Sequence, residues 1–182
     1  MFVLIAGISV TLSRSKQGEF SGFLKRGIRL FGWGLLITAV TFIAFPENTI
    51  WFGVLHLIGL SIILSYPLLK RKYLSLITGA ILITLGFISG KIILETPWLL
   101  WLGFRYPGFT SFDYVPLLPW LGIFLVGIFL GNTFYPNGKS RYRIGELKML
   151  KPIAFIGRRS LLVYLAHQPV IVGLILLAGH LS

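Results

Sequence analysis

Apolar runs separated by short polar connections are the main pattern along the chain. Five of these runs approach the roughly 20 residues that a helix needs to cross the hydrocarbon layer of a membrane. They cover about residues 28–45, 50–69, 73–93, 115–134 and 160–177. A sixth run, residues 1–12, would cover only about 18 Å at ~1.5 Å per residue, little more than half of that layer. The pattern predicts an all-α fold, a polytopic transmembrane helix bundle with five full spans and a partial N-terminal helix.

Composition supports lipid as the main solvent. The 182 residues are 55% hydrophobic and only 12% charged, with a mean hydropathy of +0.86. A soluble core of this size cannot bury so much apolar surface. We therefore interpret residues 1–182 as one integral-membrane domain. Cysteine is absent, which excludes a disulfide framework and a cysteine-based metal site.

Basic residues are concentrated in alternate connections. The net charge is +12, and the stretches 14–29, 70–72 and 139–159 hold five, three and seven of the 17 Lys and Arg residues. The positive-inside rule assigns these stretches to the cytoplasm, which predicts a plasma-membrane protein with the N-terminus of this chain outside. The rule also explains the positive charge without nucleic acid as a partner.

The first apolar run is too short to span the membrane from an outside start. Two interpretations account for it. A helix that precedes this sequence and is missing from it would have carried the chain out, or residues 1–12 form a tilted half-helix that neighbouring helices cover. A cleavable signal peptide fits poorly, because the positive charge follows the apolar run.

Aromatic residues gather where the outer connections are expected. The stretch "TPWLLWLGFRYPGF", residues 96–109, is too short and too bounded by proline to cross, so we expect it to lie flat on the outer surface or to form a lid. The stretch "QGEFSGFLKRGIRLF", residues 17–31, is interpreted as a similar segment inside. Indole rings favour the wet edge of the bilayer. Four tryptophans lie at or near the predicted outer boundary: Trp51, Trp98, Trp101 and Trp120.

Small residues recur at the spacing that brings helices together. "GFISG" places Gly86 four residues before Gly90, and "GIFLG" places Gly127 four residues before Gly131. Such pairs let two helix backbones approach closely. The pattern predicts helix contacts and nothing more specific.

Two histidines interrupt the apolar runs. His167 shares one helical stripe with Ser160 and Tyr164, while His56 has Gly53 and Gly59 at i−3 and i+3. Polar groups are costly in lipid, so both stripes should face the bundle interior. A structural explanation for each histidine is a neutral imidazole that bonds a neighbouring hydroxyl or carbonyl. A functional explanation is that the two histidines form the polar lining of a pocket between helices.

Charged candidates lie on both predicted sides. On the outer side, Asp113 precedes an expected helix and is either a cap or a group that orients His56 or a substrate. On the cytoplasmic side, Lys151, Arg158 and Arg159 are either topology anchors or a patch for phosphates below the His167 stripe. No metal site is predicted, because the histidines are widely separated and acids are few.

Three blocks carry a resemblance to a known family: "FGVLHLIGLSIILSYPLL", "FDYVPLLPWLGIFLVGIFLG" and "FIGRRSLLVYLAHQPV". Together they resemble bacterial and archaeal members of the heparan-alpha-glucosaminide N-acetyltransferase catalytic-domain family of multi-pass membrane acyltransferases. The similarity extends across the whole chain. It implies transfer of an acetyl group from cytoplasmic acetyl-CoA, as co-substrate, to an amino sugar or other amine or hydroxyl acceptor at the outer face.

The resemblance also implies site roles. His56, reached from outside, would be the base, while His167 would hold the thioester or relay a proton. Asp113 would complete the catalytic set. CoA would be bound by a group on the cytoplasmic side: Lys151, Arg158, Arg159, Ser160 and Tyr164.

One departure and two alternatives qualify the family's pattern. Family members begin with a further helix that carries an acidic and Arg-Gly motif and an outer His. This chain has none of these. Neither His56 nor His167 is therefore equated with the family's catalytic histidine. An acyltransferase predicts a water-filled cavity that links the two histidines. A small proton-coupled transporter would use them as a relay, and a non-catalytic bundle would pack and bond them. A homodimer is left open.

Overall fold

The computed structural model describes residues 1–17 and 20–136, and these residues form helices joined by turns and extended connections. Apart from one isolated bridge between Ile93 and Arg105, the described part of the chain contains no β pairing. The predicted all-α fold class is therefore confirmed. The α-helices are α1 (Phe2–Gln17), α2 (Phe20–Ala44), α3 (Val54–Ser65), α4 (Lys72–Ser89) and α5 (Leu117–Phe134). Three 3-10 helices connect them: η1 (Pro46–Asn48), η2 (Tyr66–Leu68) and η3 (Pro97–Leu102).

Three of the predicted spans are helices long and apolar enough to cross a membrane, namely α2, α4 and α5. The predicted run 50–69 differs, because α3 has only 12 residues. The α3 helix begins only after Gly53, whose backbone is extended, and it ends before η2, which contains Pro67. The predicted span 160–177 lies outside the described residues, so the number of full spans stays a prediction.

The inner stretch 17–31 does not form a separate surface element where the structure describes it. From Phe20 onward it is the beginning of α2, which starts eight residues before the predicted span. Within it, Arg26 is half-buried and donates from Nη1 to the Ser13 hydroxyl of α1 at 2.9 Å. This bond joins the end of α1 to the beginning of α2.

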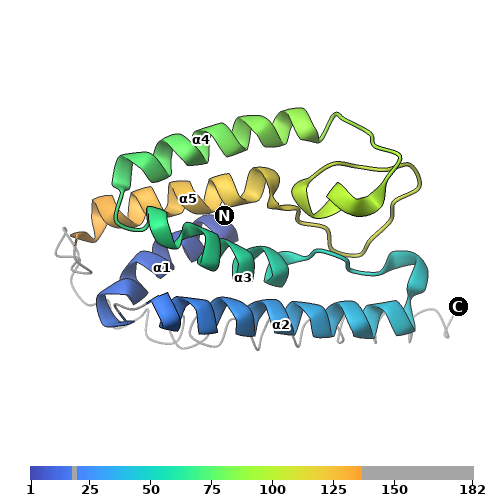
Figure 1. The fold of residues 1–182 in the computed structure, drawn as a ribbon, viewed down its shortest axis with the longest axis horizontal. Helices are drawn as coiled ribbons and strands as arrows, with labels where there is room; N and C mark the ends of the chain where they lie inside the picture. Colours follow the sequence, from blue (N-terminus) through green and yellow to red (C-terminus); the bar gives the residue numbers. More distant parts are fainter. Residues whose placement is uncertain (18–19, 137–182) are drawn as a thin grey trace, which may run out of the picture. The chain divides into compact units, whose positions relative to one another are not determined.

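Glycines set how the helices pair (Figure 1). A side chain at Gly27 of α2 would collide with the carbonyl of Gly59 in α3, and one at Gly79 of α4 would collide with that of Gly122 in α5. Both pairs of helices run antiparallel. The α1 helix packs parallel to α5, with its glycine against the Phe124 carbonyl and Gly127. Backbones approach closely at each of these points because a Cβ is absent.

The two predicted glycine motifs take part in this packing. In "GIFLG", Gly127 faces Leu4 and Gly131 faces Thr11, so both contact α1. In "GFISG", the first glycine faces Pro119 of α5, while the second is the C-terminal cap of α4. The predicted helix contacts are confirmed for three of the four glycines.

Apolar side chains are both buried and exposed, as lipid requires. The buried core centres on α3 and α5, with Leu57, Ile62, Phe124 and Ile128 almost completely enclosed. The α2 and α4 helices expose rows of large apolar side chains, a pattern that water would penalise and lipid tails accept.

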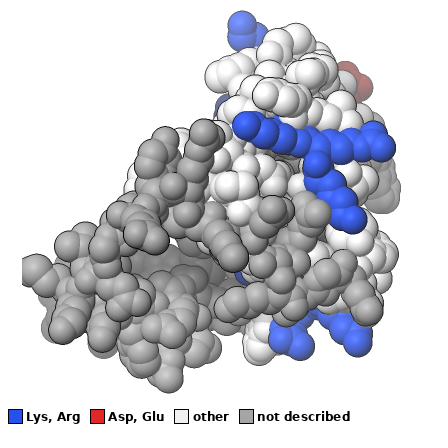
Figure 2. All heavy atoms as spheres, turned by 90° about the vertical axis from the view of Figure 1, so that its left-hand side faces the viewer, with Lys and Arg blue, Asp and Glu red and all other residues white. Residues whose placement is uncertain are grey.

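Basic side chains are concentrated at one end of the helix pairs. The beginnings of α2 and α4 and the ends of α3 and α5 meet at one end, which we call the basic end (Figure 1). Figure 2 looks onto this side of the molecule, where Lys and Arg make up most of the coloured atoms. The basic end is defined here by Lys25, Arg26, Arg29, Lys70, Arg71 and Lys72. The opposite end, where α2 connects to α3 and α4 to α5, is called the loop end.

Candidate functional site

Hydrogen bonds join the two connections at the loop end. Phe112 donates its N–H to the Asn48 carbonyl at 3.2 Å, and Val115 donates to the Phe52 carbonyl at 3.0 Å. Side chains add to this, since the Ser111 hydroxyl donates to the Thr49 carbonyl at 2.9 Å. The long connection after α4 is thereby held on the connection between α2 and α3, although about sixty residues separate them.

His56 is the third residue of α3 and is only 2% exposed. Its Nδ1 accepts the backbone N–H of Gly53 at 3.2 Å. Its Nε2 lies 3.4 Å from Thr38 Oγ1 of α2, and the Thr38 hydroxyl itself donates to the Ile50 carbonyl at 2.6 Å. Because Nδ1 accepts and the Thr38 proton is already used, the single imidazole proton belongs on Nε2. The ring is therefore neutral, and both of its nitrogens are bonded.

Aromatic and glycine residues enclose the imidazole. Phe52 stacks on it at a centroid distance of 5.5 Å, and Phe31 meets it edge-on at 5.2 Å. On the α2 side, a Cβ at Gly34 would lie 2.9 Å from Nδ1. Gly59 admits Phe31 rather than a ligand. The α2 helix thus packs directly against the imidazole and against Gly59.

Asp113 caps α3, although it lies next to α5 in the sequence. Its Oδ2 accepts the N–H of Val54, the first residue of α3, at 3.2 Å. Gly53 has no side chain to cap the helix, so Asp113 supplies the oxygen, while His56 takes the Gly53 N–H in the manner of a capping box. The structure therefore brings the two predicted outer-side candidates together at the first turn of α3.

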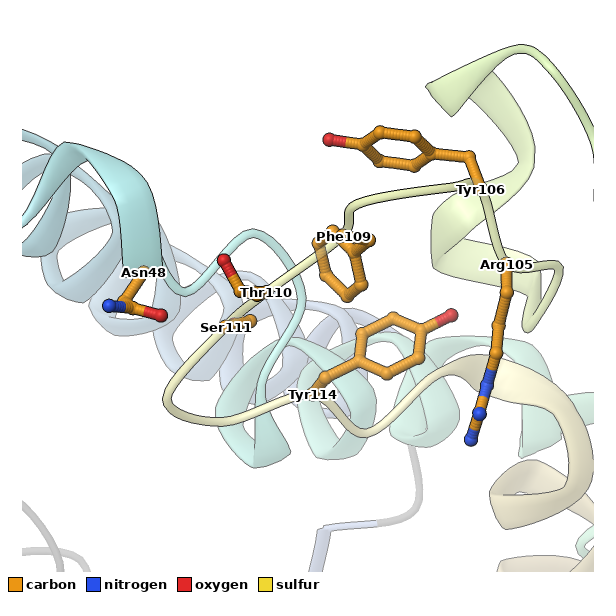
Figure 3. A pocket seen from close by; sticks show the side chains of 7 residues that line it. All are labelled: Asn48, Arg105, Tyr106, Phe109, Thr110, Ser111 and Tyr114. Atoms are coloured by element: carbon orange, nitrogen blue, oxygen red, sulfur yellow. The ribbon is translucent and has the colours of Figure 1, made fainter.

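A polar pocket of about 470 Å³ opens at the loop end (Figure 3). Phe109 lies between the rings of Tyr106 and Tyr114, at centroid distances of 5.6 Å and 5.0 Å. Hydroxyl, amide and guanidinium groups surround this aromatic wall. The lining consists of Asn48, Arg105, Tyr106, Phe109, Thr110, Ser111 and Tyr114.

Tyr114 fixes one side of the polar pocket. Its hydroxyl donates to the Leu100 carbonyl of η3 at 2.7 Å. Burial raises the pKa of Tyr114 to about 12, and the positive charge of Arg105 opposes part of that rise. The phenol is consequently neutral at physiological pH and remains a hydrogen-bond donor.

A second, aromatic pocket of about 420 Å³ adjoins the first at Tyr106, which lines both. Its lining is Trp51, Phe52, Pro97, Trp98, Leu100, Trp101 and Tyr106. His56 lines neither pocket, but Phe52 lines the aromatic pocket and also stacks on the imidazole. One ring therefore separates His56 from this pocket.

The remaining predicted site residues lie outside the part of the chain that the structure describes. They are His167, Lys151, Arg158, Arg159, Ser160 and Tyr164, so the predicted cavity between the two histidines stays a prediction. Within residues 1–17 and 20–136, no three His, Cys, Asp or Glu side chains group as metal ligands do.

Sequence reasoning missed the two pockets themselves. It recognised the tryptophans of 96–109 only as interfacial residues. The signal that could have found the polar pocket is the run of Tyr, Phe, Thr and Ser between Arg105 and Tyr114, since aromatic and hydroxyl groups together suit a small polar ligand.

Helices of this length and apolarity, with charge at their ends, define a helical membrane protein. The family model described as "Heparan-alpha-glucosaminide N-acetyltransferase, catalytic" matches residues 1–169. The chain belongs to this family of membrane acetyltransferases, which confirms the resemblance found in the sequence. No curated protein and no solved structure matches the chain.

Proposed function

We propose that the protein transfers an acetyl group from cytoplasmic acetyl-CoA to an amine or hydroxyl of an acceptor at the outer face of the plasma membrane, with an amino sugar as the first candidate. The family supports acetyl transfer in general. The observation that carries the finer proposal is the polar pocket at the loop end, beside the His56 and Asp113 cap and opposite the basic end. In this proposal the loop end faces outward and the basic end faces the cytoplasm.

The polar pocket suits a sugar. A sugar offers apolar ring faces to aromatic side chains and hydroxyls to polar ones, and the lining combines Tyr106 and Phe109 with Thr110 and Asn48. The family description names a glucosaminide as acceptor, which agrees with this chemistry. Arg105 is exposed at the rim and adds a positive charge for an anionic substituent.

The basic end suits the phosphates of CoA. Lys70, Arg71 and Lys72 lie together between α3 and α4, and Lys72 also contacts the Tyr73 and Phe129 rings, with its Nζ 5.4 Å from each centroid. In the proposal they act with a second basic set, for which Lys151, Arg158, Arg159, Ser160 and Tyr164 remain the candidates. Several cations are needed because CoA carries several phosphate charges.

The proposed reaction forms a bond from the acceptor nitrogen or oxygen to the acetyl carbon and breaks the carbon–sulfur bond of the thioester. The acceptor proton goes to a base, and CoA leaves as a thiolate. His56 is neutral and has its unprotonated Nδ1 on the Gly53 side. To act as base it must exchange the Gly53 N–H for the acceptor proton, with Phe52 turned aside. Asp113 holds the first turn of α3 in place through its bond to the Val54 N–H.

A non-catalytic bundle is the second candidate function. The observation that favours it is the burial of His56 together with the bonding of both its nitrogens. In that case the histidine only holds α2 against α3.

Labelled acetyl-CoA tests both candidates in proteoliposomes loaded with glucosamine. We expect transfer by the wild type and at least a hundredfold loss in His56→Gln and His167→Ala. The third histidine, His180, supplies the matched control, and His180→Ala should retain activity. Thermal stability is measured in parallel, so that a folding defect is recognised. Wild-type transfer that persists undiminished in both folded variants would remove the histidines from the mechanism.

A further inference from the structure

We propose that the acceptor is an amphiphile, whose sugar-like head occupies the polar pocket and whose apolar chain occupies the aromatic pocket. The inference rests on the proposed function, because it names the acceptor class for that reaction. It follows from two pockets of contrasting chemistry that share one wall, Tyr106.

The aromatic pocket has the lining that an alkyl or isoprenoid chain needs. Its walls are indole and phenyl rings, a proline and a leucine, and the polar groups of its side chains are only the Tyr106 hydroxyl and the indole N–H groups. A volume of about 420 Å³ falls within the range of about 300–1,000 Å³ that is typical of small-molecule sites. A charged or strongly hydrated ligand would lose its water there without replacement.

Exposure of the rings points in the same direction. Trp98 is 81% exposed, Trp51 52% and Trp101 42%, although all three line one pocket. Three large aromatic side chains left open around a hollow are costly in water unless an apolar surface covers them. An amphiphile that enters from the outer leaflet brings such a surface and keeps its head at the wet boundary.

The two pockets are built as one unit. Tyr114 lines the polar pocket, and its hydroxyl holds the carbonyl of Leu100, which lines the aromatic pocket. Tyr106 lines both pockets, and its ring is tilted 48° against Phe109, its neighbour in the polar pocket (Figure 3). A ligand with its head beside Phe109 would pass Tyr106 to reach the tryptophans.

The apolar chain would also contact Phe52, the ring that covers the candidate base. Phe52 is 6% exposed and forms part of the aromatic pocket, while its other contact is the His56 ring at 5.5 Å. A chain that displaces Phe52 would therefore open the route to His56. This link explains why an acceptor with a chain should be used better than its free head group.

Two acceptors separate the inference from the proposed function. Glucosamine and hexyl glucosaminide are compared in acetyl transfer by nanodisc-embedded protein. Each methylene that moves from water into an apolar site contributes roughly a fourfold factor, so we expect a KM at least about tenfold lower for the hexyl compound. Trp98→Ala should raise that KM about tenfold and so reduce the difference in KM between the two acceptors. Trp33→Ala, on α2 and outside both pockets, is the matched control and corrects for partition into the bilayer.

A binding measurement without turnover completes the test. A glucosaminide with a diazirine at the end of its hexyl chain is photolysed on the protein, and adducts are mapped. We expect adducts at residues 97–101 that hexyl glucosaminide removes by competition. Adducts here without acetyl transfer to either compound would refute the proposed function and leave the amphiphile site standing. Transfer with equal KM values, or adducts spread over the exposed faces of α2 and α4, would refute the amphiphile site alone.

Discussion

The Thr38 hydroxyl of α2 bonds two groups near the start of α3, the Ile50 carbonyl and the His56 ring, and we expect these bonds to stabilise the fold. Replacing it in Thr38→Val keeps the shape of the side chain and removes the oxygen that accepts from His56 Nε2 and donates to the Ile50 carbonyl. Side-chain hydrogen bonds within membrane proteins contribute about 0.6 to 1.7 kcal/mol each. Two are lost, so the free energy of unfolding should fall by about 1 to 3 kcal/mol.

Unfolding in a titration with sodium dodecyl sulfate measures this change. Thr84→Val is the matched control, since Thr84 is exposed on α4 and its hydroxyl bonds only the Ala80 carbonyl of the same helix, at 3.0 Å. Its effect should stay below about 0.5 kcal/mol. Thr38→Ser retains the oxygen and should recover most of the loss. If Thr38→Val unfolds no more easily than Thr84→Val, the assigned bonds of His56 are incorrect.

Three further predictions concern other parts of the bundle. Asp113→Ala should lower the free energy of unfolding by about 1 kcal/mol, because the Val54 N–H loses its cap, and Asp113→Asn should lose less; the same titration checks this. Gly27→Ala should weaken the α2–α3 contact by about 1 to 3 kcal/mol, whereas Gly32→Ala, with open space around it, should be neutral or stabilising by up to about 1 kcal/mol. For Tyr114, the raised pKa means that the folded state keeps its proton longer than the unfolded state; its contribution to stability is complete below about pH 10 and is lost as the pH rises through about 12. Ultraviolet titration at 295 nm should show an ionisation step near pH 12 that is absent in Tyr114→Phe.

The hydrophobic pattern was sufficient to predict the helices that lipid surrounds. For α2, α4 and α5 the predicted and observed ends agree within a few residues, except at the start of α2. The α3 helix was predicted too long. The predicted run starts with apolar residues at 50–52, as a span would. The helix nevertheless begins only at Val54, because Gly53 is extended and the Asp113 carboxylate caps the Val54 N–H.

The neighbourhood of His56 was only partly predictable. Its position on an inward stripe followed from the cost of a polar group in lipid. Its partners did not, because Thr38 and Asp113 come from other helices or connections, and no periodicity relates them to α3. Of the two glycines beside it, Gly59 faces Phe31 of α2, whereas Gly53 faces the Asp113 carboxylate and Ile50.

By itself, the amino-acid sequence determined the solvent, the helical class, the segregation of basic residues and the family. Each of these depends on composition, on short-range periodicity or on local motifs, which are properties of neighbouring residues and do not depend on the tertiary fold. Only the tertiary structure decided that Asp113 caps α3, that Phe52 covers His56, and that Tyr106 divides a polar from an aromatic pocket. These contacts join residues far apart in the chain, and their energies depend on distance and direction in three dimensions.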